Sequence, residues 1–489
     1  MRWLFGDHLG PHFLDAEDEP VLMIESRRVL ARLRFHRAKA HLVLSAMRHR
    51  AAELGDRCTY VQADTYEEAL DAIDAPVSVV HPTSRAALRF VRERGDIEVL
   101  PARGFATSMP EFERWAQSRG SRRLLMEDFY RDARRRLGVL MDGDEPAGGR
   151  WNFDADNREP PPRTRTLGVP EPVWPVEDAI DEQVREDLDR WERDGLVSFL
   201  GQDGPRRFAA TRAEALAVLD GFIDQRLGAF GPQEDAMLAG DPWMAHSLLS
   251  APLNLGLLDP QELVVRAEAA YREAGAPLPS VEGFVRQVIG WREFVWHLYW
   301  HFPESYRDRN ALDAHEPVPD WFAELDAGAV TAACLSAILD DVRSAGWVHH
   351  IPRLMVLGNY ALQRGWNPAA VTDWFHRAFV DGYDWVMVPN VVGMSQYADG
   401  GALATKPYVA GGAYLHRMSD YCGGCQFDPR KRVGSDACPF TAGYWAFLER
   451  NRERLTGNHR MSRALAGLGR LADLNEVVAQ EAGRGSRAP

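Results

Sequence analysis

The sequence is poor in the features that mark membrane, secreted and disulfide-bonded proteins. It has no run of about 18 uncharged apolar residues, which excludes a membrane-spanning helix. The N-terminus, MRWLFGDHLG, lacks the basic and then apolar pattern of a secretory signal. Five cysteines among 489 residues are too few for a disulfide framework. We therefore expect a cytoplasmic protein in a reducing environment.

Lysine is also scarce, and arginine supplies almost all of the positive charge. Only Lys39, Lys406 and Lys431 are present, and Asp plus Glu outnumber Lys plus Arg by 71 to 57, which gives a net charge of −14. This balance argues against a generally basic nucleic-acid-binding protein but permits a local basic groove. With 45% apolar and 10% aromatic residues, the composition predicts roughly two to four folded domains and excludes overall disorder.

Residues 1–101 alternate short apolar runs with helical segments, which predicts a parallel sheet with helices on both faces. Ligands bind at the carboxyl ends of strands in such folds, so the GDHL turn at 6–9 is a candidate site, with an ordinary turn as the alternative. We expect strands at 1–5, 21–26, 59–63, 77–82 and 97–101, and helices at 37–54, 65–73 and 84–94.

The later part of the chain is predicted to be helical. Residues 142–175 contain seven prolines and four glycines, which cannot continue a helix or sheet and indicate a connection pinned by its aromatic residues. From about residue 176 onward, apolar residues recur at helical spacing. We predict an α/β domain at 1–135, an interdomain linker at 136–205, an all-α domain at 206–480 and a disordered tail at 481–489.

Four of the cysteines have a spacing typical of a metal centre. Cys422 and Cys425 form a CxxC on a glycine-containing turn, Cys438 follows within a Cys-Pro pair, and Cys334 lies upstream on an apolar helix. Four thiolates suit a [4Fe–4S] cluster or a structural zinc ion, and the absence of a second CxxC favours the cluster. Unrelated buried thiols are the remaining alternative, and Cys58 is expected to be a core residue.

Several separated motifs carry a resemblance to a known family. They are GDHL (6–9), MEDFYR (126–131), GGRWNFDADNR (148–158), HSLLSAPLNLGLL (246–258), IGWREF (289–294), HHIPRLM (349–355), PNVVGMSQYADGG (389–401), KPYVAGGAYLHRMSDYCGGC (406–425) and ACPF (437–440). Together with the cysteines, these motifs resemble the bacterial cryptochromes and photolyases that contain an iron–sulfur cluster. The resemblance covers nearly the whole chain.

This resemblance implies a monomeric two-domain flavoprotein that acts on UV-damaged DNA. The helical domain would hold FAD, and the α/β domain would hold an antenna chromophore, 6,7-dimethyl-8-ribityllumazine in this branch. Cys334, Cys422, Cys425 and Cys438 would hold a [4Fe–4S] cluster. The positions that match the family's flavin-binding residues are Ser247, Ser250, Asn254, Gln287, Trp291, Arg292, Asn359, Asp384 and Asn390.

Further roles follow from the same resemblance. His349 and His350 match a His-His-x-x-Arg motif of animal (6-4) photolyases, in which the second histidine gives a proton to the lesion. A general acid is needed because repair of a (6-4) photoproduct moves an oxygen between bases. Trp374 matches an electron-transfer tryptophan. Antenna contacts are expected from Gly6, Asp7 and Glu25 at strand ends, and from His36 and Lys39 at the start of the first long helix.

Some positions depart from the branch pattern. Leu248, Trp296, His297, Phe375 and Met387 stand where arginine, arginine, glycine, tyrosine and an acidic residue are more usual. Loss of arginine weakens phosphate contacts, and loss of an acid near the flavin alters proton delivery. We expect light-driven repair of (6-4) photoproducts, with a cryptochrome-like blue-light photoreceptor as the alternative. A non-photochemical iron–sulfur protein resembling the primase large subunit is a third possibility, which the flavin motifs disfavour.

Overall fold

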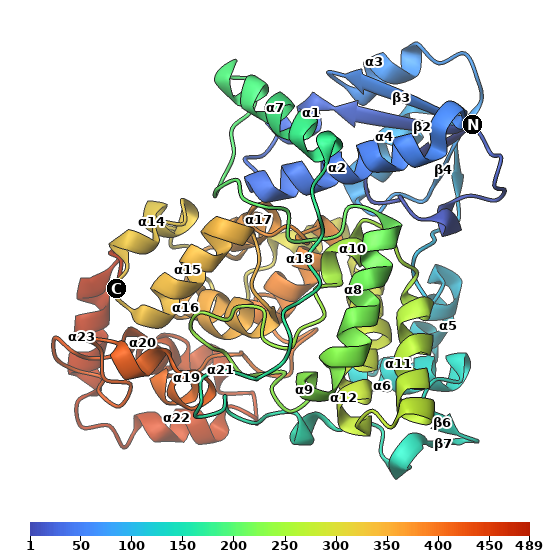
Figure 1. Ribbon diagram of the computed structural model, residues 1–489. Coiled ribbons are helices and arrows are strands. Elements are labelled where there is room, and N and C mark those ends of the chain that lie inside the picture. The colour runs from blue at the N-terminus through green and yellow to red at the C-terminus, as the bar shows by residue number, and fades with distance from the viewer.

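The computed structural model describes all residues, 1–489, and its N-terminal part contains a five-stranded sheet (Figure 1). The strands β1 (Arg2–Leu4), β2 (Val21–Ser26), β3 (Cys58–Ala63), β4 (Val77–Val80) and β5 (Ile97–Leu100) are all parallel, in the order β3-β2-β1-β4-β5. Helices α1 (Arg27–Ala31), α2 (Arg37–Leu54), α3 (Tyr66–Asp71) and α4 (Arg85–Arg94) connect them. The expected sheet and its helices are confirmed.

The strand order places a topological switch beside β1, because the chain moves from β1 to β2 on one side and crosses to β4 on the other. Loops diverge at such a switch and leave room for ligands at the carboxyl ends of the strands. Asp7 follows β1 there, and the hydroxyl of Thr83, which follows β4, donates a hydrogen bond to its carboxylate. Both β1 and β2 are fully buried and lie inside the sheet, which explains the apolar runs at 3–4 and 21–24.

The domain boundaries differ from the prediction. Helices α5 (Met109–Ser118) and α6 (Met126–Leu137) were expected in the α/β domain, but they pack on the helical domain. Phe112 of α5 stacks on His297 with ring centroids 4.5 Å apart, and Phe129 of α6 lies 5.7 Å from Phe294. Apolar side chains on these amphipathic helices therefore belong to the core of the second domain.

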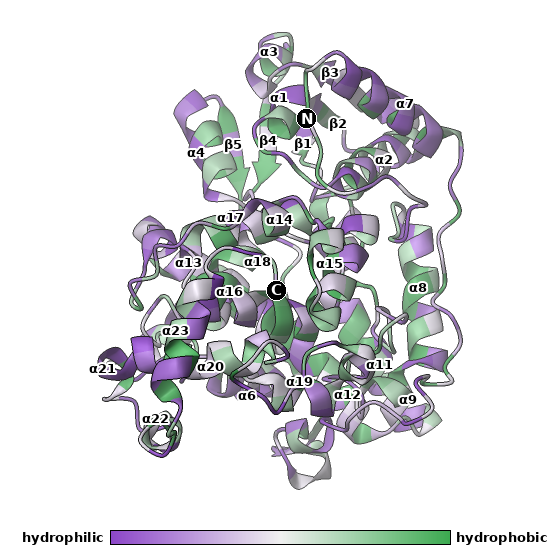
Figure 2. Cartoon of the chain, turned by 90° about the vertical axis from the view of Figure 1, so that its left-hand side faces the viewer, coloured by the Kyte–Doolittle hydropathy of each residue, from purple (hydrophilic) through white to green (hydrophobic).

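The predicted linker contains one long helix, α7 (Ala179–Arg193), which lies beside α2 of the α/β domain (Figure 1). Arg48 of α2 forms ion pairs with Glu25 and with Asp187 of α7, and His41 contacts the carbonyl of Asp181 at 3.0 Å. Figure 2 shows most of the α7 ribbon in the hydrophilic colour, as expected for a helix that covers one side of a domain.

The remainder of the linker is an extended strap that follows the surface of the helical domain. A hairpin of β6 (Met141–Asp142) and β7 (Glu145–Pro146) opens it. The backbone N–H of Phe153 donates to Glu282 at 2.9 Å, and the Trp174 ring lies 5.1 Å from Trp243. These contacts hold a proline-rich segment in place without regular secondary structure.

The rest of the chain is helical. Its helices are α8 (Arg212–Gln225), α9 (Leu227–Phe230), α10 (Ser250–Asn254), α11 (Pro260–Ala274), α12 (Leu278–Val285), α13 (Glu293–His301), α14 (Asp320–Ala323), α15 (Ala333–Ala345), α16 (Asn359–Arg364), α17 (Pro368–Ala378), α18 (Asp384–Val388), α19 (Gly412–Met418), α20 (Pro439–Arg450), α21 (Arg452–Leu455), α22 (Ser462–Leu468) and α23 (Leu474–Arg484). None of the helices is long and apolar enough to pass through a bilayer.

The C-terminal tail is ordered, contrary to the prediction for 481–489. Helix α23 continues to Arg484, and Glu481 forms ion pairs with Arg364 and Arg484. The carbonyl of Pro489 accepts hydrogen bonds from Thr331 and from the next residue, at 2.6 and 3.1 Å. A polar, glycine-containing tail thus becomes ordered because partners far away in the sequence bind its charged and carbonyl groups.

Candidate active site and metal centre

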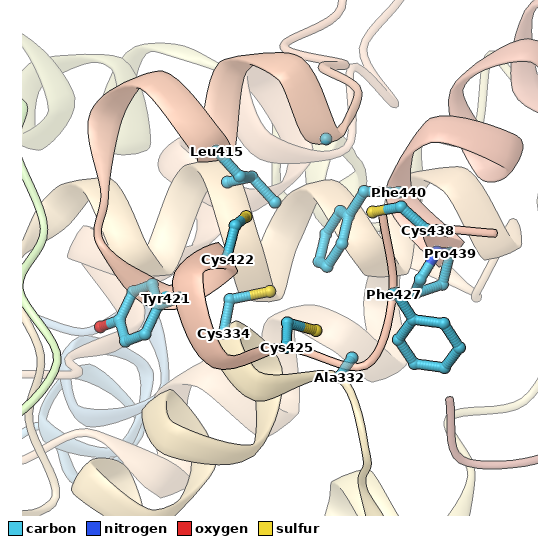
Figure 3. Close-up of a pocket in the computed structure, with 11 residues that line it drawn as sticks. Ala332, Cys334, Leu415, Tyr421, Cys422, Cys425, Phe427, Cys438, Pro439 and Phe440 are labelled. Carbon is cyan, nitrogen blue, oxygen red and sulfur yellow. The ribbon is translucent and has the colours of Figure 1, made fainter. Parts of the chain in front are cut away.

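The four predicted metal-binding cysteines meet in one pocket (Figure 3). Cys334 lies in the first turn of α15, and Cys438 is the residue directly before α20. Cys422 belongs to the short 3-10 helix η10 (Tyr421–Gly424), which Cys425 directly follows. All four are unbonded thiols, and their sulfur atoms face a common space lined mainly by apolar side chains. The four cysteines therefore form one donor set, although the first and the last, Cys334 and Cys438, are 104 positions apart in the sequence.

The chemistry of this donor set fits a metal cluster. Burial raises the pKa of Cys334, and the neighbouring cysteines raise it further. The Cys438 sulfur accepts hydrogen bonds from the backbone N–H groups of Thr441 and Phe440 at the start of α20. Gly412 leaves the space open, because a Cβ there would lie 2.8 Å from the Cys438 sulfur. Four buried thiolates would repel one another, and the positive charge of a bound metal would stabilise them in the deprotonated form.

Three π-helical turns carry or adjoin the residues expected around the flavin. They are η5 (Arg286–Arg292), η8 (Pro352–Gly358) and η9 (Pro389–Ser395). Turns of this kind are rare and occur often at functional sites, because they widen the helix and redirect side chains. Gln287, Trp291 and Arg292 lie on η5, and Asn390 lies on η9. The π turn η5 therefore lies between α12 and α13 in one continuous helical segment.

A buried ion pair organises the turn that contains the two predicted serines. Arg353 holds Asp381 through two hydrogen bonds of 2.8 and 3.1 Å. The same carboxylate accepts the Ser250 hydroxyl at 2.6 Å, and the Asp381 carbonyl accepts the Asn254 amide at 3.0 Å. Sequence reasoning missed Asp381. Its signal was the arginine of the HHIPRLM motif, which needs a carboxylate partner once it is buried.

The backbone before Ser250 is strained. Met244 and Leu248 adopt φ of 45° and 58°, in the left-handed region that residues with a Cβ rarely occupy. The Ser247 hydroxyl accepts a weak hydrogen bond of 3.4 Å from the backbone of Leu249. Strain of this kind persists only where surrounding structure fixes it, which is common in ligand-binding turns.

Two residues on η5, Gln287 and Arg292, contact other parts of the protein. Gln287 donates to the buried carboxylate of Glu234 at 2.6 Å. Arg292 donates to the carbonyl of Gly104 at 3.1 Å, and its guanidinium lies 4.4 Å from the centre of the Phe105 ring. Burial lowers the pKa of Arg292, and its Nε has no hydrogen-bond partner in the protein.

Two other residues predicted to contact the flavin already have some hydrogen-bond partners in the protein. Asp384 accepts the Tyr299 hydroxyl at 2.7 Å and is paired with Arg307. Asn390 donates to the Val386 carbonyl at 2.9 Å, which leaves its side-chain oxygen available.

Asn359 has a different role from the one expected. Its side-chain amide donates to the carbonyls of Met355 and Ala410, and its oxygen accepts from Gln363 and from the backbone of Ala410. These four bonds use the full capacity of the amide, so no donor or acceptor remains for a cofactor. Asn359 instead joins α16 to the segment before α19.

Two of the expected antenna residues already form hydrogen bonds with other residues of the protein. Glu25 is almost completely buried and accepts hydrogen bonds from Arg48, Tyr60 and Gln62. His36 is fully buried, and its Nδ1 accepts the backbone N–H of Ala38 at the start of α2. The structure gives both residues a role in folding, because an acid or imidazole inside the protein needs partners that the sequence alone does not identify.

The remaining antenna candidates lie at the interface of the two domains. Gly6 and Asp7 are at the carboxyl end of β1. Lys39 reaches from α2 into the helical domain and donates to the carbonyls of His376, at 2.8 Å, and Gly382. Burial lowers the pKa of Lys39 to about 7, although Asp381 and Asp384 oppose the shift.

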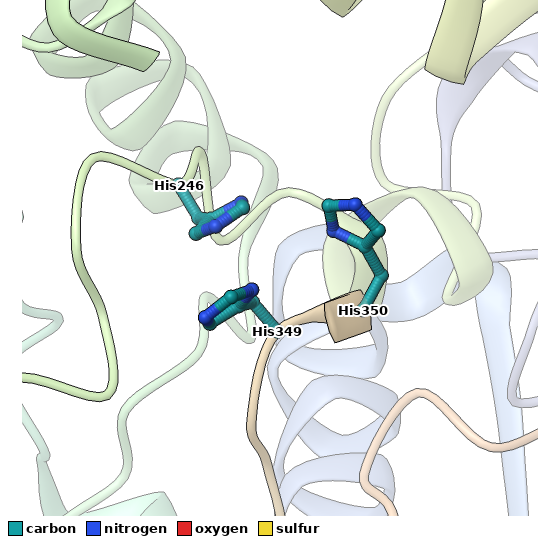
Figure 4. Close-up of side chains that lie close together, drawn as sticks. All are labelled: His246, His349 and His350. Carbon is teal, nitrogen blue, oxygen red and sulfur yellow. The ribbon is translucent and has the colours of Figure 1, made fainter. Parts of the chain in front are cut away.

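Three histidines form a compact cluster (Figure 4). His349 and His246 are buried and stacked, with ring centroids 4.2 Å apart, and burial lowers the pKa of both. His350 is more exposed, with 45% of its side chain accessible, and its Nε2 lies 3.7 Å from Asp235. One buried nitrogen each of His246 and His349 has no hydrogen-bond partner. Sequence reasoning did not identify His246.

The predicted electron-transfer residue Trp374 is 1% exposed and surrounded by phenylalanine. Its ring lies 4.4 Å from Phe322, 5.2 Å from Phe375 and 6.0 Å from Phe379. No tyrosine or tryptophan ring lies directly against Trp374. Its neighbours therefore offer no easily oxidised ring with which it could exchange an electron.

Comparisons with known proteins relate the whole chain to one family. Residues 2–196 match the family model described as deoxyribodipyrimidine photo-lyase-related protein. The chain is 40% identical over 497 aligned residues to a protein of Agrobacterium fabrum (strain C58) named (6-4) photolyase, covering 96% of this chain and 95% of that protein.

Solved structures show the same architecture. A bacterial class III photolyase from Agrobacterium tumefaciens matches with a TM-score of 0.57 at 16% identity, covering 99% of this chain and 96% of that one. A cryptochrome from Synechocystis sp. PCC6803 matches with a TM-score of 0.53 at 12% identity, covering 85% and 87%. At such low identities these two matches show the fold alone.

Proposed function

The chain belongs to the photolyases, in their deoxyribodipyrimidine photo-lyase-related branch, and on that premise we propose that it repairs (6-4) photoproducts in UV-damaged DNA with the energy of blue light. The observation that carries the proposal is the placement of His350, the accessible member of a cluster whose other two imidazoles are buried. The 40% identity to a (6-4) photolyase over nearly the whole chain supports it.

FAD is the proposed cofactor of the helical domain. When bound, FAD supplies light absorption and an electron for the lesion. Ser247 on the strained turn and Ser250 and Asn254 on α10 are the proposed contacts of its phosphates. The proposed contacts of the rest of the cofactor are Gln287, Trp291, Arg292, Asp384 and Asn390. The buried Arg292 Nε and His246 Nε2 lack protein partners, which supports a polar ligand in their vicinity.

The four cysteines are proposed to hold a [4Fe–4S] cluster. Their convergence from three separate segments supports a metal centre, and the N–H groups directed at Cys438 are suited to cluster sulfur chemistry. The apolar lining around the sulfurs limits access of water. Zinc remains the alternative occupant, and iron analysis distinguishes the two.

His350 acts as the general acid in this proposal. Burial lowers the pKa of His246 and His349 and closes both rings off from solvent. His350 is the accessible member of the cluster and is therefore the one placed to meet the lesion. An imidazolium at His350 would form an ion pair with Asp235 at 3.7 Å. The damaged bases must leave the helix stack to reach it, which costs a few kcal/mol and less at an already distorted lesion.

The antenna and quaternary structure are also proposed. Gly6 and Asp7 at the switch between β1 and β4, and Lys39 on α2, are the remaining candidates for contacts with 6,7-dimethyl-8-ribityllumazine. We expect the protein to be a cytoplasmic monomer that binds UV-damaged DNA.

A cryptochrome-like photoreceptor is the second candidate. Leu248 places an apolar side chain, 4% exposed, in the turn proposed to hold phosphates. Phe375 beside Trp374 and Met387 on α18 likewise replace residues with redox or acid–base capacity. These features favour flavin photochemistry with weak repair.

One experiment separates the two functions. The flavin of the purified protein is reduced chemically, oligonucleotides with either a (6-4) photoproduct or a cyclobutane dimer are added, and restored bases are measured after blue light. Repair of the (6-4) lesion alone supports the proposal, and absence of repair with normal flavin content supports the photoreceptor. His350→Ala should lose (6-4) repair and retain FAD, whereas His315→Ala, an exposed histidine elsewhere, should retain both.

A further inference from the structure

The histidine cluster contains two buried ring nitrogens that no protein group satisfies. They are Nε2 of His246 and Nδ1 of His349, in residues that are 8% and 3% exposed. Figure 4 shows that both rings turn a nitrogen towards His350, and one nitrogen of each ring lies within 4.8 Å of those of the other two. Because a buried polar atom without a partner is costly, this arrangement indicates an ion bound between the rings.

The positions of the three rings are close to those that a small ion requires. In a tetrahedral zinc site, bonds of about 2.0–2.1 Å place neighbouring ligand nitrogens about 3.3 Å apart, so these nitrogens need to approach by at most about 1.5 Å. The His246 ring is packed between Phe230, at 5.6 Å, and His349, at 4.2 Å. His350 is more exposed, so rotation about its side-chain bonds supplies part of the movement.

The chemistry of the cluster suits a transition metal. Imidazole nitrogen binds zinc, copper and nickel well, whereas magnesium and calcium prefer oxygen. Burial lowers the pKa of His246 and His349, which favours the uncharged imidazole that a metal binds. The Asp235 carboxylate lies 3.7 Å from Nε2 of His350, and a carboxylate on the far nitrogen of a ligating imidazole holds the ring and makes it a better ligand.

Four charged side chains lie near the rings, namely Glu234, Asp235, Arg226 and Arg353. The two arginines would disfavour a cation, but each has partners of its own. Arg353 is paired with Asp381, and Arg226 donates to two backbone carbonyls. Asp235 also lies 3.9 Å from the more exposed Arg158, while the buried Glu234 is in no ion pair. A cation beside His350 therefore complements a buried carboxylate that has no ionic partner.

A second group of a histidine and two acids differs from this cluster in one respect. His49 of α2 lies near Asp178 and Asp181 at the start of α7. Arg206 donates to both oxygens of Asp181, at 2.9 and 3.1 Å, so this group already contains a cation. It provides a matched control for metal binding.

We propose that His246, His349 and His350 bind a divalent transition-metal ion of the zinc class, and that the bound ion stops repair. An imidazole that has given its lone pair to a metal no longer forms the imidazolium, so His350 loses the proton that it would supply to the lesion. The inhibition rests on the proposed function, whereas the binding of the ion does not.

The test is a calorimetric titration of the FAD-loaded protein with zinc chloride, with iron content measured before and after. The wild type should bind one zinc ion at this cluster, and His246→Phe should bind it at least tenfold more weakly. Phenylalanine keeps a ring between Phe230 and His349 but offers no nitrogen. Asp235→Asn should weaken binding by about 10–100-fold, and the control His49→Gln should leave it unchanged.

His350→Ala provides a second variant, at an exposed position, and it should also lose the zinc ion. FAD content and the thermal midpoint show whether each variant is folded. With chemically reduced flavin, repair by the wild type should fall as zinc is added and return when EDTA removes it.

The possible outcomes separate the site from the repair function. Absence of zinc binding by the wild type overturns the site, and so does wild-type affinity in both His246→Phe and His350→Ala or loss of the ion in His49→Gln alone. Zinc taken up with release of iron, in the variants as in the wild type, assigns the ion to the cysteines and also overturns the site. Bound zinc with full repair overturns the inhibition. A wild type that binds zinc at the cluster but repairs nothing even without it supports the site and refutes the proposed function.

Discussion

Asp381→Asn tests whether the buried ion pair with Arg353 fixes the flavin turn. The substitution keeps the size of the side chain but removes its negative charge. The carboxylate now accepts two hydrogen bonds from the Arg353 guanidinium and one from the Ser250 hydroxyl. The two side chains are 6% and 16% exposed. Removal of one partner from a buried pair typically costs about 3–5 kcal/mol, and the partial exposure of Arg353 places the expected loss near ~3 kcal/mol.

The expected result is a lower thermal midpoint and weaker FAD binding. If the turn that binds FAD is destabilised by ~3 kcal/mol, the dissociation constant for FAD rises by about two decades. Thermal unfolding followed by the release of FAD fluorescence, together with FAD titration of the apoprotein, measures both quantities.

Asp373→Asn is the matched control, because Asp373 also pairs with an arginine, Arg307, but is 48% exposed. An exposed pair contributes about 0–1 kcal/mol, so this variant should differ little from the wild type. Equal effects of the two substitutions, or unchanged FAD affinity in Asp381→Asn, would refute the assigned role of the buried pair.

Three further predictions concern the metal centre and the domain contacts. Cys334→Ser should reduce bound iron and the visible absorbance of the purified protein; normal iron content would exclude Cys334 as a ligand. Gly412→Ala places a Cβ 2.8 Å from the Cys438 sulfur and should lower iron content, whereas Gly424→Ala, where a Cβ meets nothing within 4 Å, should not; overpacking costs about 1–3 kcal/mol. Burial alone would raise the pKa of Asp181, but the His49 imidazole 3.5 Å away and the hydrogen bonds from Arg206 outweigh it and lower the pKa. The stabilisation is therefore present above the unfolded pKa of about 3.9 and is lost as pH falls, so the thermal midpoint of Asp181→Asn should vary less between neutral and acidic pH than that of the wild type.

The local pattern of the sequence was enough to determine the α/β part of the fold. Short apolar runs at 21–26 and 77–82 predicted buried parallel strands, because both faces of such strands are covered, and the structure has strands at Val21–Ser26 and Val77–Val80. The same holds for α2 and α4, which begin and end within a few residues of the predicted bounds. Assignment of α5, α6 and α7 to a domain failed, because amphipathicity shows that a helix has an apolar face but not which neighbour covers it.

The sequence by itself determined the sheet, the predominance of helix after residue 176 and the cysteine set, since period and spacing record burial and ligand geometry directly. Only the tertiary structure decided which polar residues are free to bind a ligand. Asn359, Glu25 and His36 matched the expected positions yet are saturated by partners, some near and some far along the chain. Asp381 and His246 gained their roles from long-range contacts with Arg353 and His349, which no local pattern contains.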